Sequence, residues 1–319
     1  MTTEKAKFRV FTIKAGKEAN QLFIFMESVI VNLKSLGKIR TSETYATSLS
    51  SFKRFRKGRD MALEAVDSDT MIAYEAWLKD CGLSPNTCSF YMRNLRAVYN
   101  RAVEKGLTTQ QFPFKHVYTG VEKTVKRAVP LKTIRQIREM DLSDSPASDF
   151  ARDMFLFSFY TRGMSFVDMA YLRKKNLQGG ILSYRRRKTG QQLFIKWEKC
   201  MQVIVDKYAM PQSDYLLPIV KPSCSLEERK QYIYTSHNIN RRLKIIGHKL
   251  GLSLPLTMYV SRHAWASIAK SKNVPVSVIG EALGHESEAT TRIYLASLGT
   301  PAIDKANNLI LKSLERDYR

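Results

Sequence analysis

Apolar residues recur at steps of three and four along most of the chain, which is the period of an amphipathic helix. In the first third this pattern predicts four or five helices, of which four are placed at about residues 20–36, 42–57, 68–80 and 85–105. Gly37, Gly82 and Gly106 follow three of these segments, and glycine often ends a helix because it adopts left-handed backbone conformations. We therefore expect a helical unit without a clear strand over residues 20–110, after an N-terminal extension at residues 1–19.

The pattern changes beyond residue 130. Helical periods continue at about residues 131–140, 150–160 and 166–172. Apolar and polar residues then alternate at 179–184 and 192–197, which predicts two strands joined by a basic turn at 185–190. The rest is helical in pattern, including a tail helix at 301–319. The expected fold is mainly α, and its second domain, residues 131–319, is an α+β domain with a small β-hairpin or sheet.

Charge is the outlier of the composition. Hydrophobic residues make up 44% of the 319 residues, which is ordinary for a globular protein. By contrast, 52 Lys and Arg face 29 Asp and Glu, which gives a formal net charge of +23. Such an excess costs self-repulsion and is usually retained where a polyanion neutralises it. Nucleic acid is the first expected partner, an anionic membrane surface is the second, and a basic protein with neither partner is the third reading.

The stretch at residues 111–130 has no sustained period and separates the two domains. It contains two prolines and a glycine at Pro113, Pro130 and Gly120, together with several lysines and an arginine. These residues are typical of an irregular connection. We interpret the stretch as an interdomain linker that lies on or near DNA, and an exposed solvated loop is the alternative.

Several classes of protein are disfavoured. No run of about 18 apolar residues is present, so no membrane span is expected, and the first 17 residues lack the apolar core of a signal peptide. The four cysteines are widely spaced and form no CxxC pair. This usage predicts a reducing cytoplasm, no disulfide framework, no metal and no cofactor.

The most informative segments lie near the C-terminus. They read T-M-Y-V-S-R-H at 257–263, L-G-H-E at 283–286 and T-T-R-I-Y at 290–294. In this order they resemble the tyrosine recombinase (phage integrase) family, which has T-x-H-x-x-R-H, then L-G-H, then a nucleophilic tyrosine nine residues later. Here 23 residues separate Arg262 from His285, and nine separate His285 from Tyr294. Three motifs at fitting spacing are far more specific than L-G-H alone.

The resemblance covers the whole chain, and it is closest to Bacteroides-type integrases of mobile elements. It implies a SAM-like core-binding domain followed by a catalytic domain. Tyr294 would attack phosphorus and form a 3′-phosphotyrosine with a free 5′-hydroxyl, so that neither ATP nor metal is needed. Arg262 would fork onto two phosphate oxygens, His285 would donate one hydrogen bond, and Lys188 in the basic turn would protonate the 5′-oxygen. Each residue alone has a simpler structural explanation, and only their joint spacing favours catalysis.

Two positions depart from the family pattern. Tyr259 occupies the place of the histidine in T-x-H-x-x-R-H, and a phenol with a pKa near 10 supplies no positive charge. Ser165 occupies the place of the family's first arginine in T-G-x-R-x-x-[ED]-x-x-x-L. Arg162, three residues earlier, and Arg186, two residues before Lys188, are equal candidates for the missing cation. A further alternative is that catalysis is lost.

Basic residues outside these motifs are expected to contact double-stranded DNA. They are Lys53, Arg54, Arg56, Arg93 and Arg96 in the first domain and Arg241 and Arg242 in the second, the latter two following a helix start expected at Ser236. A homo-oligomer, a tetramer on DNA, is expected. The tail helix would dock on a neighbouring protomer or on its own domain, and accessory DNA-bending proteins are further candidate partners.

The predicted function is that of a site-specific recombinase or integrase in the cytoplasm, associated with the nucleoid. A DNA-binding regulator on an inactive recombinase fold is the main alternative. A relaxing enzyme similar to type IB topoisomerases, with the same chemistry but no pairing of sites, is another.

Overall fold

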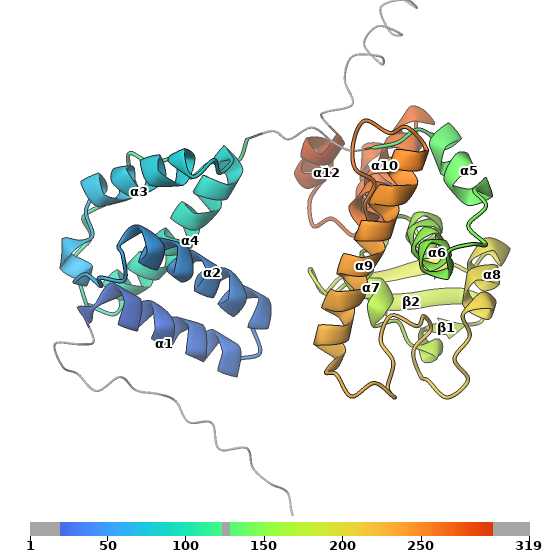
Figure 1. Ribbon diagram of the computed structural model, residues 1–319, viewed down its shortest axis with the longest axis horizontal. Helices are drawn as coiled ribbons and strands as arrows, with labels where there is room; N and C mark the ends of the chain where they lie inside the picture. Colours follow the sequence, from blue (N-terminus) through green and yellow to red (C-terminus); the bar gives the residue numbers. More distant parts are fainter. Residues whose placement is uncertain (1–19, 123–127, 296–319) are drawn as a thin grey trace, which may run out of the picture. The chain divides into compact units, whose positions relative to one another are not determined.

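The computed structural model describes residues 20–122 and 128–295, apart from the side chains of residues 293 and 294. The chain divides into two compact units between Thr124 and Val125 (Figure 1). The N-terminal extension at 1–19 and the tail helix expected at 301–319 lie outside the described residues. No helix in the described part is long and apolar enough to cross a membrane.

Over residues 20–122 the first unit contains four α-helices and one 3₁₀ turn, in agreement with the apolar period of the sequence. They are α1 (Leu22–Ser35), α2 (Ile39–Phe55), η2 (Leu63–Ala65), α3 (Ser68–Asp80) and α4 (Pro85–Glu104). Helix α2 begins three residues earlier than the expected position 42. Phe52 and Tyr74 meet at the centre of this unit with ring centroids 4.8 Å apart in an edge-to-face arrangement, a geometry that aromatic pairs prefer.

The core of the first unit extends further along the chain than residue 110. Phe114 and Val117 are both buried in it. The backbone N–H of Tyr118 donates to Glu75 on α3, and the carbonyl of Gly120 accepts from Ser89 on α4. Residues that the sequence assigned to the start of a linker therefore belong to the packed helical unit, because two apolar side chains six and nine positions past Thr108 anchor them.

The second unit holds eight α-helices, one 3₁₀ turn and a small sheet within its described residues. They are α5 (Leu131–Glu139), α6 (Pro146–Tyr160), α7 (Phe166–Ala170), η3 (Lys174–Asn176), β1 (Leu177–Gln178), β2 (Ile181–Arg185), β3 (Gln192–Lys196), α8 (Lys199–Lys207), α9 (Glu228–Lys249), α10 (Met258–Ser271), α11 (Val276–Leu283) and α12 (Glu288–Leu295). The mainly α fold with a small antiparallel sheet is confirmed.

The sheet is an antiparallel meander in the order β1–β2–β3. Its register pairs Leu182 with Ile195 and Tyr184 with Leu193. These four side chains are buried and face the helices, while their neighbours in sequence point outward, as the period of two predicted. Strand β1 was not expected, because two residues are too few to show an alternating pattern.

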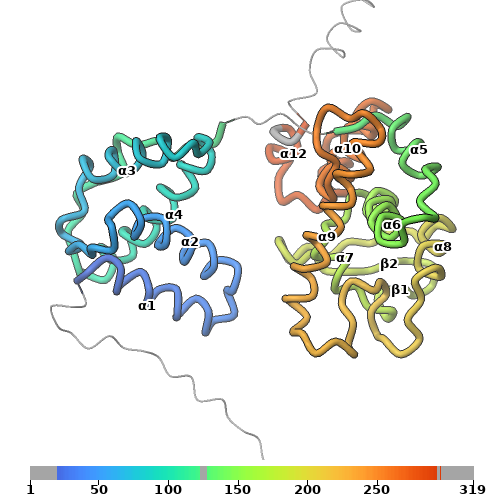
Figure 2. Tube along the Cα trace, viewed as in Figure 1, coloured from blue at the N-terminus to red at the C-terminus, as the bar shows by residue number. Residues whose placement is uncertain are grey.

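Helix α6 is the centre of the second unit. It contacts α5, α8, α9 and α10, and in Figures 1 and 2 it lies among these helices. Its residues from Met154 to Phe157 are all buried, because this part of the helix packs against neighbouring helices on several sides. It begins at Pro146 rather than near residue 150, because proline at the first helical position costs no hydrogen bond.

Helix α9 corrects one expectation. The sequence suggested a helix start at Ser236, but α9 runs from Glu228 to Lys249, so Ser236 lies in its third turn. Serine is a frequent N-cap, yet here the buried stripe that ends in Leu243 and Ile246 extends back to Gln231. Packing of that whole stripe decides where the helix begins.

A charged cluster fastens α8 to α6. Lys207 donates to Asp153 at 2.6 Å and also pairs with Asp149, while Arg152 bonds both carboxylates and the carbonyl of Met140. Only 7% of the Asp153 side chain is exposed. Because a buried carboxylate is costly without partners, Asp153 depends on these cations.

Candidate active site

Arg262 lies in the second turn of α10 and is 94% buried, with a relative exposure of 6%. Its Nη1 donates to the carbonyl oxygen of Gly163 at 2.9 Å, and its Nη2 donates to that of Leu283 at 2.5 Å. These acceptors come from the loop after α6 and from the end of α11. Two segments that are far apart in sequence thus orient one guanidinium group.

Gly163 allows this loop to approach α10. Its backbone has a φ of +73°, and a Cβ built there would lie 2.7 Å from the Cα of Arg262. A side chain is excluded for both reasons, since L-residues rarely adopt this φ and the clash is with backbone. The glycine of the T-G-x-R pattern is therefore required here because the backbone of Arg262 packs directly against it.

The turn between α11 and α12 receives a second arginine. Gly284 ends α11 in the left-handed conformation, with a φ of +64°, and its carbonyl oxygen accepts from Nη1 of Arg186. The last carbonyls of a helix carry partial negative charge. The end of α11 thus holds two guanidinium groups through the neighbouring carbonyls of Leu283 and Gly284.

The structure separates the two candidates for the missing cation. Arg186 lies in the turn between β2 and β3, has only 8% exposure, and reaches the turn that carries His285. Arg162 has a left-handed backbone, with a φ of +60°, and its Nη1 donates to the carbonyl of Phe194 on β3 at 3.2 Å. Of the two, Arg186 is the one bonded to the α11–α12 turn in the described structure.

Ser165 has a structural role at the start of α7. It is the N-cap of α7, and its Oγ donates to Oδ2 of Asp168 at 2.6 Å. The other oxygen of Asp168 accepts the backbone N–H of Arg187 at 2.9 Å. The Ser165–Asp168 pair therefore holds the hairpin turn from which Arg186 and the exposed Lys188 project.

His285 connects the arginines to α12. Its Nε2 lies 3.2 Å from Nη2 of Arg262, and its Nδ1 lies 2.9 Å from Oγ1 of Thr291. Burial, and then the positive charges of Arg262, Arg186 and Lys188, lower the pKa of His285 to about 4. The imidazole is neutral at pH 7, so its hydrogen-bonding role depends on which nitrogen carries the proton.

Tyr259 lies on the exposed side of α10 with 60% of its surface accessible. Its ring packs edge-on against His263, with centroids 4.4 Å apart, and His263 itself is buried. Packing on His263 therefore holds the Tyr259 ring in place at the start of α10 while the phenol projects outward. Tyr294 lies in the last turn of α12, and its side chain is outside the described residues.

Three residues that support this site were not singled out in the sequence. They are Gly163, which contacts Arg262, and the residues Asp168 and Thr291. The first two belong to the T-G-x-R-x-x-[ED] segment, so their family positions were a signal that was available. Thr291 is six residues from His285, and neither a regular helix nor a regular strand brings side chains at that spacing into contact. Only the turn between α11 and α12 brings them together.

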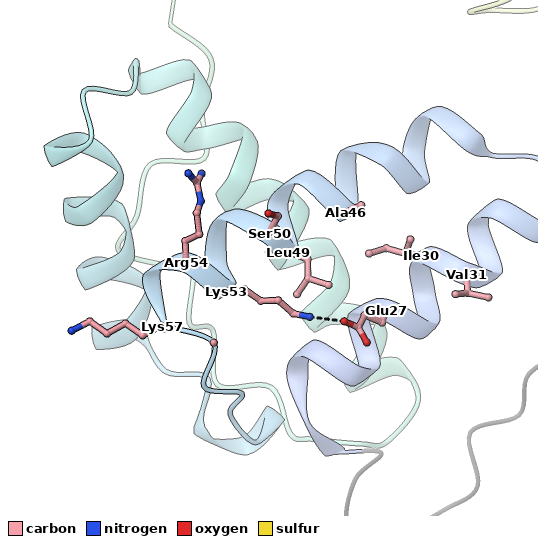
Figure 3. A pocket seen from close by; sticks show the side chains of 10 residues that line it. Glu27, Ile30, Val31, Ala46, Leu49, Ser50, Lys53, Arg54 and Lys57 are labelled. Carbon is pink, nitrogen blue, oxygen red and sulfur yellow. Dashed lines mark hydrogen bonds and ion pairs between the residues drawn. The ribbon is translucent and has the colours of Figure 1, made fainter. Parts of the chain in front are cut away.

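Among the basic residues expected to contact DNA, those of the first unit gather on α2 and α4. Arg54, Arg93 and Arg96 are exposed. Lys53 instead reaches across a groove of about 750 Å³ to Glu27 on α1, at 2.5 Å (Figure 3). Arg56 is half-buried at the end of α2. These residues differ in how readily they can meet a phosphate.

In the second unit, Arg241 and Arg242 lie on α9, where Arg241 is exposed and Arg242 half-buried. Both line a cavity of about 460 Å³ that also includes Tyr234. Within the described part of the chain, no three His, Cys, Asp or Glu side chains meet in a way that could hold a metal ion.

Comparison with known proteins follows this division into two units. Residues 21–117 match the phage integrase SAM-like domain, and residues 133–299 match the phage integrase family. The chain belongs to the phage integrase family, whose members are tyrosine recombinases.

Relatives and solved structures agree with this assignment. Tyrosine recombinase XerD of Pseudomonas aeruginosa is 20% identical over 261 residues, which cover 80% of this chain and 85% of XerD. A lambda integrase dimer bound to a COC′ core site has a similar fold, with a TM-score of 0.66 and 17% identity over 88% of this chain and 78% of the integrase. A lambda integrase tetramer bound to a Holliday junction gives a TM-score of 0.64 and 16% identity over the same shares of the two chains.

Proposed function

We propose that this protein is a site-specific DNA recombinase that cleaves and rejoins strands through a 3′-phosphotyrosine on Tyr294. The observation that carries the proposal is the convergence of Arg262, Arg186 and His285 on the turn between α11 and α12. Membership of the phage integrase family supports it for the unit that contains this turn. Arg262 and Arg186 supply the preorganised donors that phosphoryl transfer requires, and His285 contacts Arg262 rather than serving as a donor itself.

The reaction follows from the residue chemistry. The phenol oxygen of Tyr294 attacks phosphorus, and the bond between phosphorus and the 5′-oxygen breaks. Lys188 gives its proton to the departing 5′-oxygen, which leaves as a hydroxyl, and the proton that the attacking phenol of Tyr294 releases passes through solvent and restores the charge of Lys188. Arg262 and Arg186 stabilise the charge that develops on the non-bridging oxygens. One phosphodiester bond replaces another, so neither ATP nor a metal ion is consumed, and reversal by a second 5′-hydroxyl completes strand exchange.

Arg186 is the preferred substitute for the arginine absent at position 165. Its guanidinium is buried and bonded to Gly284, the residue before His285. A cation held within the site is worth more than one in solvent, because the surroundings screen it less. Arg162 in turn supports β3 through Phe194. Tyr259 completes the set as a neutral hydrogen-bond partner of the phosphate.

Double-stranded DNA is the proposed substrate and partner. The net charge of +23 and the exposed basic side chains on α2, α4 and α9 support phosphate contacts by both units. We further propose a tetramer on DNA, by analogy with the lambda integrase tetramer on a Holliday junction. Association with the nucleoid, a role in a Bacteroides-type mobile element and the use of DNA-bending accessory proteins are parts of the same proposal.

A nicked suicide substrate tests the central claim. Loss of the short 5′-fragment traps the covalent intermediate, which denaturing gels resolve as a protein–DNA adduct. Wild-type protein is expected to form the adduct, and Tyr294→Phe is expected to bind DNA without forming it. An adduct that survives Tyr294→Phe contradicts the assignment of the nucleophile, and no adduct with wild type favours an inactive DNA-binding regulator. A two-site recombination assay then separates a recombinase from a relaxing topoisomerase.

A further inference from the structure

Thr291 is a fully buried polar residue beside His285. It lies on α12, three residues before Tyr294, with a relative exposure of 0%. Its Oγ1 is 2.9 Å from Nδ1 of His285. The apolar residues Ile279, Leu283 and Leu295 form the nearby cluster between α11 and α12. Burying a hydroxyl in such surroundings is costly without a hydrogen-bond partner, so the bond to His285 stabilises the packing of Thr291.

The contacts of His285 determine its tautomer. Arg262 has only donors, so the 3.2 Å contact between its Nη2 and Nε2 of His285 requires Nε2 to accept. In a neutral imidazole the proton then resides on Nδ1, which donates to Oγ1 of Thr291. The neutral state is favoured first by burial of the ring and then by its charged neighbours, Arg262, Arg186 and Lys188, which are all positive.

Gly280 makes room for this arrangement. It lies in α11, and a Cβ built on it would come within 2.6 Å of Oγ1 of Thr291. Even alanine at position 280 would displace the hydroxyl from its place against the ring. The close packing of α11 on α12 is therefore built around the Thr291 side chain.

We infer that Thr291 is a positioning residue, which fixes His285 in its Nδ1–H tautomer with Nε2 facing Arg262 and links that orientation to the seating of α12. The inference rests on the proposed function, because α12 also carries Tyr294. If α12 leaves its place on α11, His285 loses the acceptor of its Nδ1 proton. Packing of α12 on α11 and orientation of His285 are then coupled. When α12 is displaced together with Tyr294, the imidazole of His285 also loses its fixed orientation.

Thr291→Val tests this inference, because it removes the hydroxyl and keeps the shape. The cleavage rate constant on suicide DNA is expected to fall about 10- to 100-fold, because misplacement of an active-site group on the ångström scale has effects of this size. Thr290→Val is the matched control, since Thr290 is the adjacent, exposed residue whose hydroxyl contacts Ser287. It is expected to cleave at the wild-type rate.

Nitrogen-15 NMR of the imidazole rings gives a readout independent of cleavage. The His285 signals are assigned by comparison with His285→Gln among the five histidines. Wild type is expected to show one Nδ1–H tautomer, and Thr291→Val a mixture of tautomers. A single Nδ1–H tautomer together with an unchanged cleavage rate in Thr291→Val overturns the inference.

A second pair of variants covers the case in which Thr291→Val does not fold. Thr291→Ser and Thr291→Ala differ only by the hydroxyl. Serine is expected to restore the wild-type tautomer and most of the cleavage rate, and alanine is expected to restore neither. Equal behaviour of the two variants overturns the inference. If wild-type protein forms no covalent adduct the proposed function fails, whereas the tautomer measurement still decides the role of Thr291.

Discussion

Replacing Gly163 by alanine perturbs the contact that seats Arg262. The residue has a φ of +73°, and the added Cβ would lie 2.7 Å from the Cα and 2.9 Å from the Cγ of Arg262. A left-handed backbone costs a residue with a side chain about 1–2 kcal/mol. Overpacking against backbone, which no rotamer change relieves, costs about 1–3 kcal/mol more. We expect Gly163→Ala to lower the free energy of unfolding by about 2–5 kcal/mol.

Gly251→Ala separates the two contributions. Gly251 has a similar φ of +65°, but a Cβ there would meet nothing within 4 Å. This variant is expected to lose only the backbone part, about 1–2 kcal/mol. Both positions lie in the second unit, so the two variants report on the same unfolding transition. Urea denaturation followed by circular dichroism at fixed pH and salt measures both.

Catalysis distinguishes the two variants further. The carbonyl of Gly163 accepts from Arg262, so a displaced loop also shifts the guanidinium. Suicide-substrate cleavage by Gly163→Ala should fall at least about tenfold, in view of the sensitivity of phosphoryl transfer to misplacement on the ångström scale. Gly251→Ala should cleave normally. Equal losses of stability in the two variants, or normal cleavage by Gly163→Ala, would refute the reasoning about this contact.

Three further predictions concern charge. Arg186→Ala should abolish cleavage in the suicide assay with nearly unchanged DNA affinity, whereas Arg162→Ala should retain most activity; the reverse result would assign the missing cation to Arg162. The pKa of His285 is lowered from 6.5 to about 4, so the unfolded state binds more protons between these values and stability should decline as pH falls through this window. His285→Gln should flatten that decline in urea titrations, and an unaltered slope would contradict it. Asp153→Asn should cost about 2 kcal/mol of unfolding free energy because two cations lose a buried acceptor, while the exposed Glu288→Gln should cost less than about 0.5 kcal/mol; similar losses would show that burial is not the cause.

Local patterns predicted the helices well where packing agrees with the sequence period. Helix α3 has the expected bounds of 68 and 80, because Asp67 caps its first turn and Gly82 follows its end. Helix α9 was placed too late, since Ser236 has the chemistry of a cap but lies in a stripe that packs along its whole length. Propensity at one residue is weaker than the burial of a helix face.

The same limit applies to the site. Motif spacing located Arg262, His285 and the α12 segment that contains Tyr294, because family patterns record residues that meet in space. The choice between Arg162 and Arg186 was open in the sequence, since the answer depends on where a hairpin turn meets the end of α11. The roles of the Gly163, Leu283 and Gly284 carbonyls as acceptors for the two arginines could not be predicted from the sequence for a related reason. Every residue has a carbonyl, and only the fold decides which of them face a guanidinium.

The anchoring of Arg262 and Arg186 by carbonyl oxygens has a thermodynamic consequence. Carbonyls orient the two guanidinium groups but do not cancel their charge, so the folded unit retains mutual repulsion among these side chains. An anion that enters the site relieves this repulsion, and a ligand that binds only the folded state stabilises it by RT ln(1 + [L]/Kd). The DNA backbone is then a stabiliser of the catalytic unit as well as its substrate, and the protein should be at its most heat-resistant while it holds the strand that it cuts.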